Sequence, residues 1–366
     1  MNGRVQKIKI FVDWNPIINK GEDPQPKKIA FIDNGEGMNK ERIPDSLVFG
    51  YHKSKENAKK RISKFGYGAK AAFLSNCRKS EIYSKIKGVD WYYSYFDLDS
   101  NEIKNTDNDY PPDSIRKKPP KNLEDTWENL KSGTITIWTK FDKGHVEKNK
   151  EEIAFWIFRA YRKFIGIKVV QADEKKKKSK IQMNTDKIKI WYNNQLLDAY
   201  DPLYAIPYRK DDKKGGELWN PVFIKYPKPD GSGLGIITVQ IGVSPVEWRK
   251  KVGSSAEDPV NLDERCIRGT SSKRGRTFAS FTDSRKISII RNNREVSWLH
   301  DHWLFGRLTD YDRWWGMEIL YDSELDDVFQ VKNIKYQVEL LSETRKKLKD
   351  ELLPTVIEIR KSIKDV

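Results

Sequence analysis

The chain of 366 residues is longer than one hydrophobic core usually serves, so two domains are expected. Hydrophobic residues make up 37% and aromatic residues 12%, which allows packed cores although 33% of the residues are charged. The formal net charge of +16 favours polyanionic partners such as nucleic acid or a nucleotide, although a lysine-rich proteome gives the same balance.

The two cysteines, Cys77 and Cys266, lie far apart and lack the C-x-x-C spacing. This argues against a disulfide framework and a structural zinc site, and it fits a reducing cytosol. No apolar run approaches the roughly 20 residues that span a bilayer, and the first residues lack the apolar block of a signal peptide. We therefore expect a cytoplasmic protein without a membrane segment.

The first half of the chain predicts a mixed α+β domain that ends near residue 170. Residues 5–13 and 28–33 are expected to form neighbouring strands, and residues 39–64 a polar segment with helical pieces. Further strands are expected in "SEIYSKIKG", "VDWYYSYFDL" and "SGTITIWTKF". The segment "EEIAFWIFRAYRKFIG" predicts a helix, because its apolar residues recur at three- and four-residue spacing.

The second half predicts a smaller α/β domain over residues 171–335 and C-terminal helices over 336–366. The run Lys175–Lys178 is expected in a solvated loop, and "KIKIWYNNQLLDAYDPL" in a hairpin that turns at Asn193-Asn194. "GLGIITVQIGV" and "KISIIRNNREV" predict strands separated by a polar loop of about forty residues, a length typical of functional loops. Pro354 is expected to kink or split the helical end.

The segment "IDNGEGM" ends an apolar strand with a carboxylate and two glycines. A carboxylate such as that of Asp33 can accept the exocyclic amine of adenine, and backbone without side chains at Gly35 and Gly37 lets a planar base lie against the main chain. Alone the pattern is weak, because many turns share it.

Two further glycine motifs follow in the chain. "FGYGAKAA" places Gly66, Gly68 and Lys70 at a helix start, where free backbone N–H groups and the lysine charge favour an anion. The alternative is a glycine-rich entry to a structural helix. The pair Gly133-Thr134 then opens the strand "TITIWT".

In this order the three motifs resemble those of the GHKL ATPases, the superfamily of gyrase B, MutL, the heat-shock chaperone ATPase and histidine kinases. The sequence is most similar to the MORC-like branch, because "LVFGYHKSKE" sits between the first two motifs. The resemblance covers most of residues 5–170. It implies a Bergerat-type ATP-binding α/β sandwich, followed by a transducer-like α/β domain and a helical tail.

The resemblance also implies roles for individual residues. Asp33 would bind the adenine amine, and Thr134 would back the adenine end. The loop of Gly35, Gly37 and Met38 would line the base. Residues 39–64 would form a lid with Lys53 on its phosphate side, and the phosphates would be wrapped by Gly66, Gly68 and Lys70. ATP and Mg²⁺ are the implied cofactors.

Residues 313–337, "RWWGMEILYDSELDDVFQVKNIKYQ", resemble the end of the transducer domain of such proteins. In the superfamily a transducer lysine reaches the γ-phosphate and couples the nucleotide state to domain movement. Lys335 is the expected residue and Lys332 the second choice, the alternative being a surface lysine before a helix.

The sequence departs from the family at its beginning. GHKL enzymes carry a water-activating glutamate and a Mg²⁺-binding asparagine one helix before the first strand, and no residue here takes these roles by motif. Loss of a general base costs about 10²- to 10⁴-fold in rate. We expect that the start codon is assigned one helix too late; the alternative is a chain that binds ATP weakly and hydrolyses it poorly.

Two other groups of residues are candidate binding sites. His300 and His302 form a His-x-His pair, but no further ligands accompany it, and ordinary polar residues are expected. Residues 266–286 combine basic and aromatic side chains suited to nucleic acid, a solvated loop being the alternative. The expected nucleic-acid contacts are Arg268, Lys273, Arg274 and Arg276.

Together these observations predict an ATPase whose lid closure and domain movement switch a dimeric clamp acting on DNA or a protein partner. The dimer and the clamp are implied by the resemblance alone. Two alternatives stay open: a nucleotide-binding scaffold that does not hydrolyse ATP, and a basic DNA-binding module whose glycines are structural.

Overall fold

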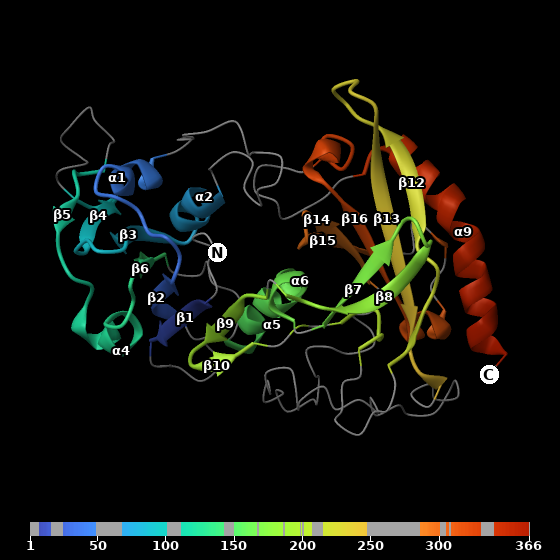
Figure 1. The fold of residues 1–366 in the computed structure, drawn as a ribbon, viewed down its shortest axis with the longest axis horizontal. Helices are drawn as coiled ribbons and strands as arrows, with labels where there is room; N and C mark the ends of the chain where they lie inside the picture. Colours follow the sequence, from blue (N-terminus) through green and yellow to red (C-terminus); the bar gives the residue numbers. More distant parts are fainter. Residues whose placement is uncertain are drawn as a thin grey trace. The chain divides into compact units, whose positions relative to one another are not determined.

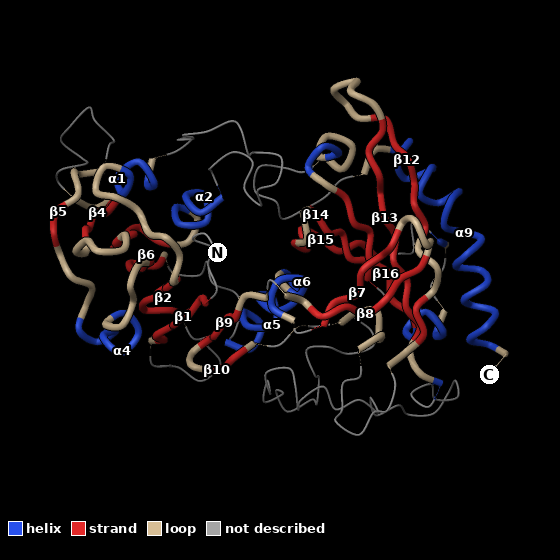
Figure 2. Tube along the Cα trace, in the orientation of Figure 1, coloured by secondary structure: helices blue, strands red, loops and turns tan. Residues whose placement is uncertain are grey.

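A computed structural model describes residues 7–15, 25–48, 68–100, 111–142, 150–166, 168–185, 187–197, 199, 201–206, 215–246, 286–300, 305–306, 309–330 and 340–365. The chain divides into two compact units, the first comprising Met1–Glu56, Phe65–Ala154 and Lys187–Leu197. The second comprises Asn57–Lys64, Phe155–Asp186 and Asp198–Val366. Both units combine sheets with helices, which confirms the α+β class (Figure 1, Figure 2).

The first unit is built on an eight-stranded sheet in the order β10-β9-β1-β2-β6-β3-β4-β5. Its strands are β1 (Lys7–Trp14), β2 (Pro26–Asp33), β3 (Cys77–Lys85), β4 (Tyr92–Asp97), β5 (Ile115–Arg116), β6 (Gly133–Phe141), β9 (Lys189–Tyr192) and β10 (Gln195–Leu196). All neighbours pair antiparallel except β1 and β9, which are parallel. The strands expected in the first half of the chain are confirmed.

Helices cover both faces of this sheet. On one face α1 (Arg42–Leu47) packs Ile43 and Leu47 against Ile82 of β3. On the same face Phe73 of α2 (Gly68–Leu74) contacts the ring of Trp138, with the centroids 6.4 Å apart. On the other face lies α4 (Glu124–Trp127), which follows the short 3₁₀ turn Lys121–Leu123 and packs its tryptophan on β3 and β4.

The hairpin of β9 and β10 belongs to the first unit, although it follows the boundary expected at residue 170. Its turn is Asn193-Asn194, as predicted, with φ values of 43° and 69°. Val12 donates its N–H to Asn193 Oδ1 at 2.8 Å, and β9 pairs with β1. The sheet of the first unit is therefore completed by a segment from later in the chain.

The second unit holds a sheet in the order β11-β13-β16-β14-β15, with β12 paired to β13. Its strands are β11 (Glu217–Leu218), β12 (Val222–Pro227), β13 (Leu234–Val243), β14 (Lys286–Arg291), β15 (Arg294–His300) and β16 (Trp315–Tyr321). "KISIIRNNREV" is a hairpin rather than the single strand expected, because Asn292 and Asn293 adopt positive φ values of 45° and 65°. Asparagine tolerates this conformation better than most residues.

The helix α9 (Ser342–Lys364) covers one face of this second sheet (Figure 1). Its buried side chains recur every three or four residues, and they include Leu348, Leu352, Val356, Ile359 and Ile363. Of the kink or split expected at Pro354, the split is not found, because a single helix passes through this proline. No helix among the described residues has the length and apolar character that crossing a membrane requires.

Three further groups of elements complete the described part of the second unit, and the first of them includes the boundary between the two units. They are α5 (Lys150–Ala160) with α6 (Arg162–Ile165), the two-stranded ribbon of β7 (Lys168–Asp173) and β8 (Lys178–Met183), and the 3₁₀ turns Asp310–Trp314 and Ser323–Leu325. The division between the two units falls within α5. The lysine run lies at the exposed turn of the ribbon, which confirms the solvated loop.

Candidate functional site

The strand β2 ends at Asp33 with a partly buried carboxylate. Gly35 donates its N–H to Asp33 Oδ1 at 2.8 Å, and the backbone of Thr134 also bonds to this carboxylate. Burial raises the pKa of Asp33 above its ordinary value, and these two hydrogen bonds counteract part of the shift. The carboxylate is therefore a dehydrated acceptor, which gains when a further N–H donor reaches it.

The loop after Asp33 returns along the ends of two neighbouring strands. Gly37 has φ of +74°, and a Cβ on it would lie 1.9 Å from the carbonyl oxygen of Lys85. Gly133 has φ of +153°, and a Cβ there would lie 2.2 Å from the carbonyl oxygen of Asp33. Both glycines are thus required by close backbone approach, and the room that they leave is filled by protein backbone.

Ser84 joins this loop to the sheet, a role that the sequence analysis missed. Its fully buried hydroxyl accepts the N–H of Met38 at 2.9 Å and donates to the carbonyl oxygen of Gly133 at 3.0 Å. It also lies 2.9 Å from Thr134 Oγ1. A serine where the alternation of "SEIYSKIKG" expects a buried side chain was the available signal.

The strand register places the three polar side chains on one face of the sheet. Asp33 is the direct partner of Thr134, and Thr134 is the direct partner of Ser84. Directly opposed residues of antiparallel strands point to the same face. This is the face of Ile82 and Trp138, against which α1 and α2 pack.

The described part of the second glycine motif lies on α2. A Cβ on Gly68 would meet nothing within 4 Å, and its φ is not positive, so neither packing nor conformation of the described chain requires glycine here. Lys70 is only 9% exposed and has no hydrogen bond or ion pair to any described residue. Burial lowers the pKa of the Lys70 ammonium below its ordinary value, so this cation would gain from an anion.

The predicted residues thus fall into three groups. Asp33, Gly35, Met38 and Thr134 are joined by hydrogen bonds, with Gly37 packed between them, while Gly68 and Lys70 lie on α2. The remaining ones lie outside the described residues: Lys53, Gly66, Arg268, Lys273, Arg274, Arg276, Lys332 and Lys335.

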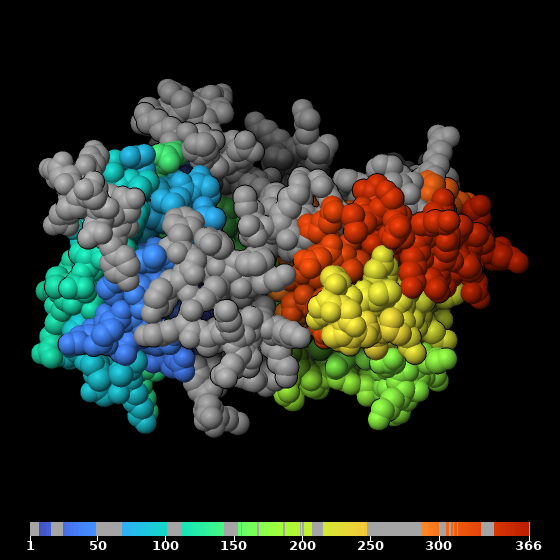
Figure 3. Space-filling view, turned by 90° about the horizontal axis from the view of Figure 1, so that it is seen from above, coloured from blue at the N-terminus to red at the C-terminus, as the bar shows by residue number. Residues whose placement is uncertain are grey.

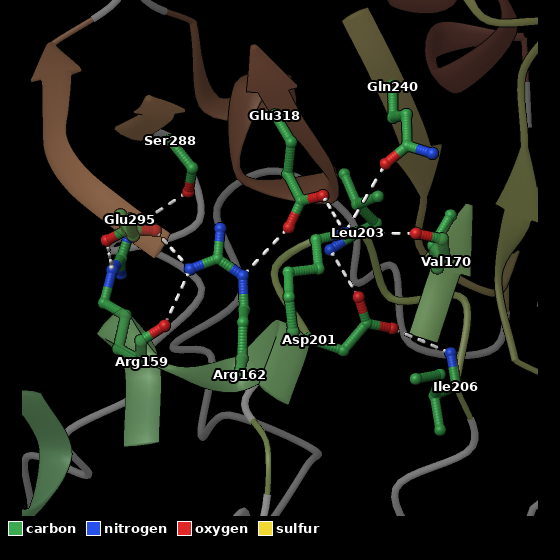
Figure 4. Close-up of polar contacts among 11 residues, drawn as sticks. Arg159, Arg162, Val170, Asp201, Leu203, Ile206, Gln240, Ser288, Glu295 and Glu318 are labelled. Atoms are coloured by element: carbon green, nitrogen blue, oxygen red, sulfur yellow. Dashed lines mark hydrogen bonds and ion pairs between the residues drawn. The ribbon is translucent and has the colours of Figure 1, made fainter. Parts of the chain in front are cut away.

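The second unit contains a separate buried polar centre (Figure 4). Arg159 of α5 donates Nε–H to Glu295 Oε1 at 2.5 Å, and Arg162 of α6 donates Nε–H to Glu318 Oε1 at 2.9 Å. Arg162 also bonds to Glu295, and Lys163 pairs with Glu318 at 2.5 Å. All of these side chains are at most 10% exposed, so helices and sheet are held together by dehydrated ion pairs.

The carboxyl groups of this centre differ in their pKa values. Burial by itself would raise the pKa of Glu318, but the charges of Lys163 and Arg162 outweigh it and hold that pKa below its ordinary value. The carboxylate of Asp201 accepts the N–H groups of Leu203 and Ile206 at 3.0 and 2.8 Å, and these bonds and the charge of Lys163 offset only part of the effect of burial. Burial raises its pKa to about 6. Apart from the acid in "WWGMEIL", nothing in the sequence pattern pointed to this centre.

Comparison with known proteins bears on the first of these two centres. A search of curated proteins finds no match. No cluster of three or more His, Cys, Asp or Glu side chains suited to a metal occurs among the described residues. Residues 1–134, which contain Asp33 and end at Thr134, match the model of the family described as histidine kinase-, DNA gyrase B- and HSP90-like ATPase.

Proposed function

We propose that the first unit binds ATP, with Asp33 as the acceptor of the adenine amine. The observation that carries the proposal is the carboxylate of Asp33 itself: it is dehydrated, partly exposed and fixed by the N–H of Gly35. The family match over residues 1–134 supports a nucleotide as the ligand.

The residues present fit both ends of the nucleotide. Thr134 and Ser84 lie beside Asp33 on the same face and hold the end of β6 in place for the base. Lys70, a buried cation without a described partner, suits the phosphates. No described residue is assigned to Mg²⁺, which in nucleotide sites is held largely by phosphate oxygens and water.

The test compares Asp33→Asn with the matched control Asp13→Asn, a change at an exposed carboxylate on β1 of the same sheet. Removing a charge-assisted hydrogen bond costs about 1.5–3 kcal/mol, so the Kd for ATP should rise by roughly 10- to 150-fold in Asp33→Asn. Titration calorimetry measures the Kd of each protein for ATP and, for comparison, for GTP. Asp13→Asn should bind ATP as the unchanged protein does. Equal ATP affinity of all three proteins would refute the role of Asp33.

The wider proposal is a cytosolic GHKL-type ATPase of the MORC-like kind. The lid formed by residues 39–64 would close over ATP, and the second, transducer-like unit would move, with Lys335 reaching the γ-phosphate. A dimeric clamp on DNA or a protein partner would then close. Light scattering with and without ATP tests the dimer, and phosphate release separates an ATPase from a scaffold that only binds the nucleotide.

A further inference from the structure

The ribbon of β7 and β8 concentrates positive charge on the second unit. Residues 168–183 contain six lysines against one aspartate and one glutamate. The lysines are Lys168, Lys175, Lys176, Lys177, Lys178 and Lys180, all of them exposed. The ribbon reaches the surface as the light-green segment of Figure 3, so this charge faces solvent.

The turn of the ribbon has a defined conformation. Asp173 and Lys178 are the last paired residues, and Lys176 donates its N–H to Asp173 Oδ1 at 3.1 Å. Lys177 adopts φ of +49° and donates its N–H to the carbonyl oxygen of Glu174 at 3.4 Å. The lysines are therefore presented by an ordered hairpin.

The two faces of the ribbon differ. Val170 is buried against Leu203 and Ala205, and its carbonyl oxygen accepts a hydrogen bond from Lys163 Nζ at 3.1 Å. These contacts attach the ribbon to the rest of the second unit. Strand alternation places Gln171, paired with Lys180, on the opposite face. That face also carries Lys178 and is polar and basic towards the turn.

No acidic side chain of the described chain forms an ion pair with these lysines. Some lysines elsewhere in the described part of the chain are paired with acids: Lys28 pairs with Asp13 at 3.0 Å, and Lys140 with Asp97 at 2.9 Å. The charge of the ribbon is left for an external anion, and clustered charges attract a polyanion much more strongly than dispersed ones.

We propose that the β7–β8 ribbon is a contact site for double-stranded DNA. A two-stranded antiparallel ribbon fits the major groove of B-form DNA, whereas that of A-form RNA is too narrow. Residues 168–183 contain no aromatic side chain on which the bases of a single strand could stack. The exposed Ile181 and Met183 lie on the face of Val170 rather than on the basic face, which disfavours insertion into a membrane.

The inference makes DNA the partner in the proposed function, but it does not depend on nucleotide binding. The test variant is K175Q/K176Q/K178Q/K180Q, which leaves Lys177 and its positive φ unchanged. The control K118Q/K121Q/K346Q/K349Q removes four exposed lysine charges at other sites, so that the net charge of both variants is equal.

Fluorescence anisotropy without ATP measures the binding of a labelled DNA duplex of about 20 base pairs, or two helical turns. The plot of log K against log salt has a negative slope, and each phosphate contact that is lost should make this slope shallower by about 0.9. We expect the affinity of the ribbon variant for DNA to fall at least about tenfold at 0.1 M salt, with a salt slope shallower by about 2–4. The affinity of the control variant should fall less than about threefold.

Three results would overturn the proposal: no DNA binding by the unchanged protein, an equal loss in both variants, or a ribbon variant that loses binding to phosphatidylserine vesicles and keeps DNA. Thermal melting and ATP affinity are measured on every variant. Unchanged values separate a lost DNA contact from misfolding and from any failure of the nucleotide site.

Discussion

The packing around Gly37 predicts that Gly37→Ala weakens ATP binding strongly. The new Cβ would lie 1.9 Å from the carbonyl oxygen of Lys85, where an ordinary contact is 3.4–4 Å. The loop must therefore move by more than an ångström. That shift breaks the bond from the Met38 N–H to Ser84 Oγ, now 2.9 Å, and displaces the loop whose Gly35 N–H holds the Asp33 carboxylate.

The expected size follows from three costs. An alanine with positive φ costs about 1 kcal/mol, and one lost hydrogen bond about 1 kcal/mol. Misplacing a binding group by about 1 Å costs up to about 100-fold in enzymes. We expect the Kd for ATP to rise by roughly 30- to 100-fold, since about 1.4 kcal/mol corresponds to tenfold.

Two other glycines separate the two causes of this loss. Gly88 has φ of +82° but nothing within 4 Å of its Cβ position, so Gly88→Ala introduces conformational strain without a clash. Gly68→Ala introduces neither, and it tests the second glycine motif on its own. Calorimetric titration of the three variants with ATP should rank Gly37→Ala lowest in affinity and Gly88→Ala near the unchanged protein. Full ATP affinity of Gly37→Ala would show that the loop does not position the base.

Two further predictions concern the buried polar centre of the second unit. Glu318→Gln removes the carboxylate that Arg162 and Lys163 share, and breaking such a buried ion pair should cost about 3–5 kcal/mol of stability. Adding Lys163→Met removes one of the two cations left behind, so hydrogen exchange should show the double variant to be less destabilised than the two single changes together. Asp201 has a pKa of about 6 against an ordinary 3.8, so the folded state binds its proton more tightly and loses stability as the pH rises from 4 to 6. Relative to Asp201→Asn, the unchanged protein should therefore be about 2 kcal/mol less stable at pH 7 than at pH 4, and parallel pH profiles of the two would contradict the assignment.

The sequence predicted the strands around the candidate site because their alternation and turn residues act locally. Asp33 and Thr134 could be paired from the resemblance, and the register confirms that they are neighbours. Ser84 could not be predicted, since its role depends on which strand lies beside β6. Such long-range pairing has no periodic signature in one sequence.

The buried ion pairs were missed for a related reason. Arg159 and Arg162 lie in a segment that was predicted to be one helix with one buried face, but charged residues are normally assigned to the exposed face. Their partners Glu295 and Glu318 follow more than 130 residues later. The role of Gly37 was likewise only partly predictable: the need for glycine was clear, but the contact with Lys85 was not.

The hairpin of β9 and β10 has a consequence for dividing the protein experimentally. The chain leaves the first unit within α5, supplies Phe155–Asp186 to the second, and returns for Lys187–Leu197. A fragment ending at residue 170 would lack β9 and leave the long edge of β1 unpaired, and such an edge invites aggregation. During synthesis β1 has no partner on this edge until the residues of β9 emerge, 182 positions after those with which they pair. A soluble first unit therefore needs β9 joined back to it through a short linker in place of residues 155–186.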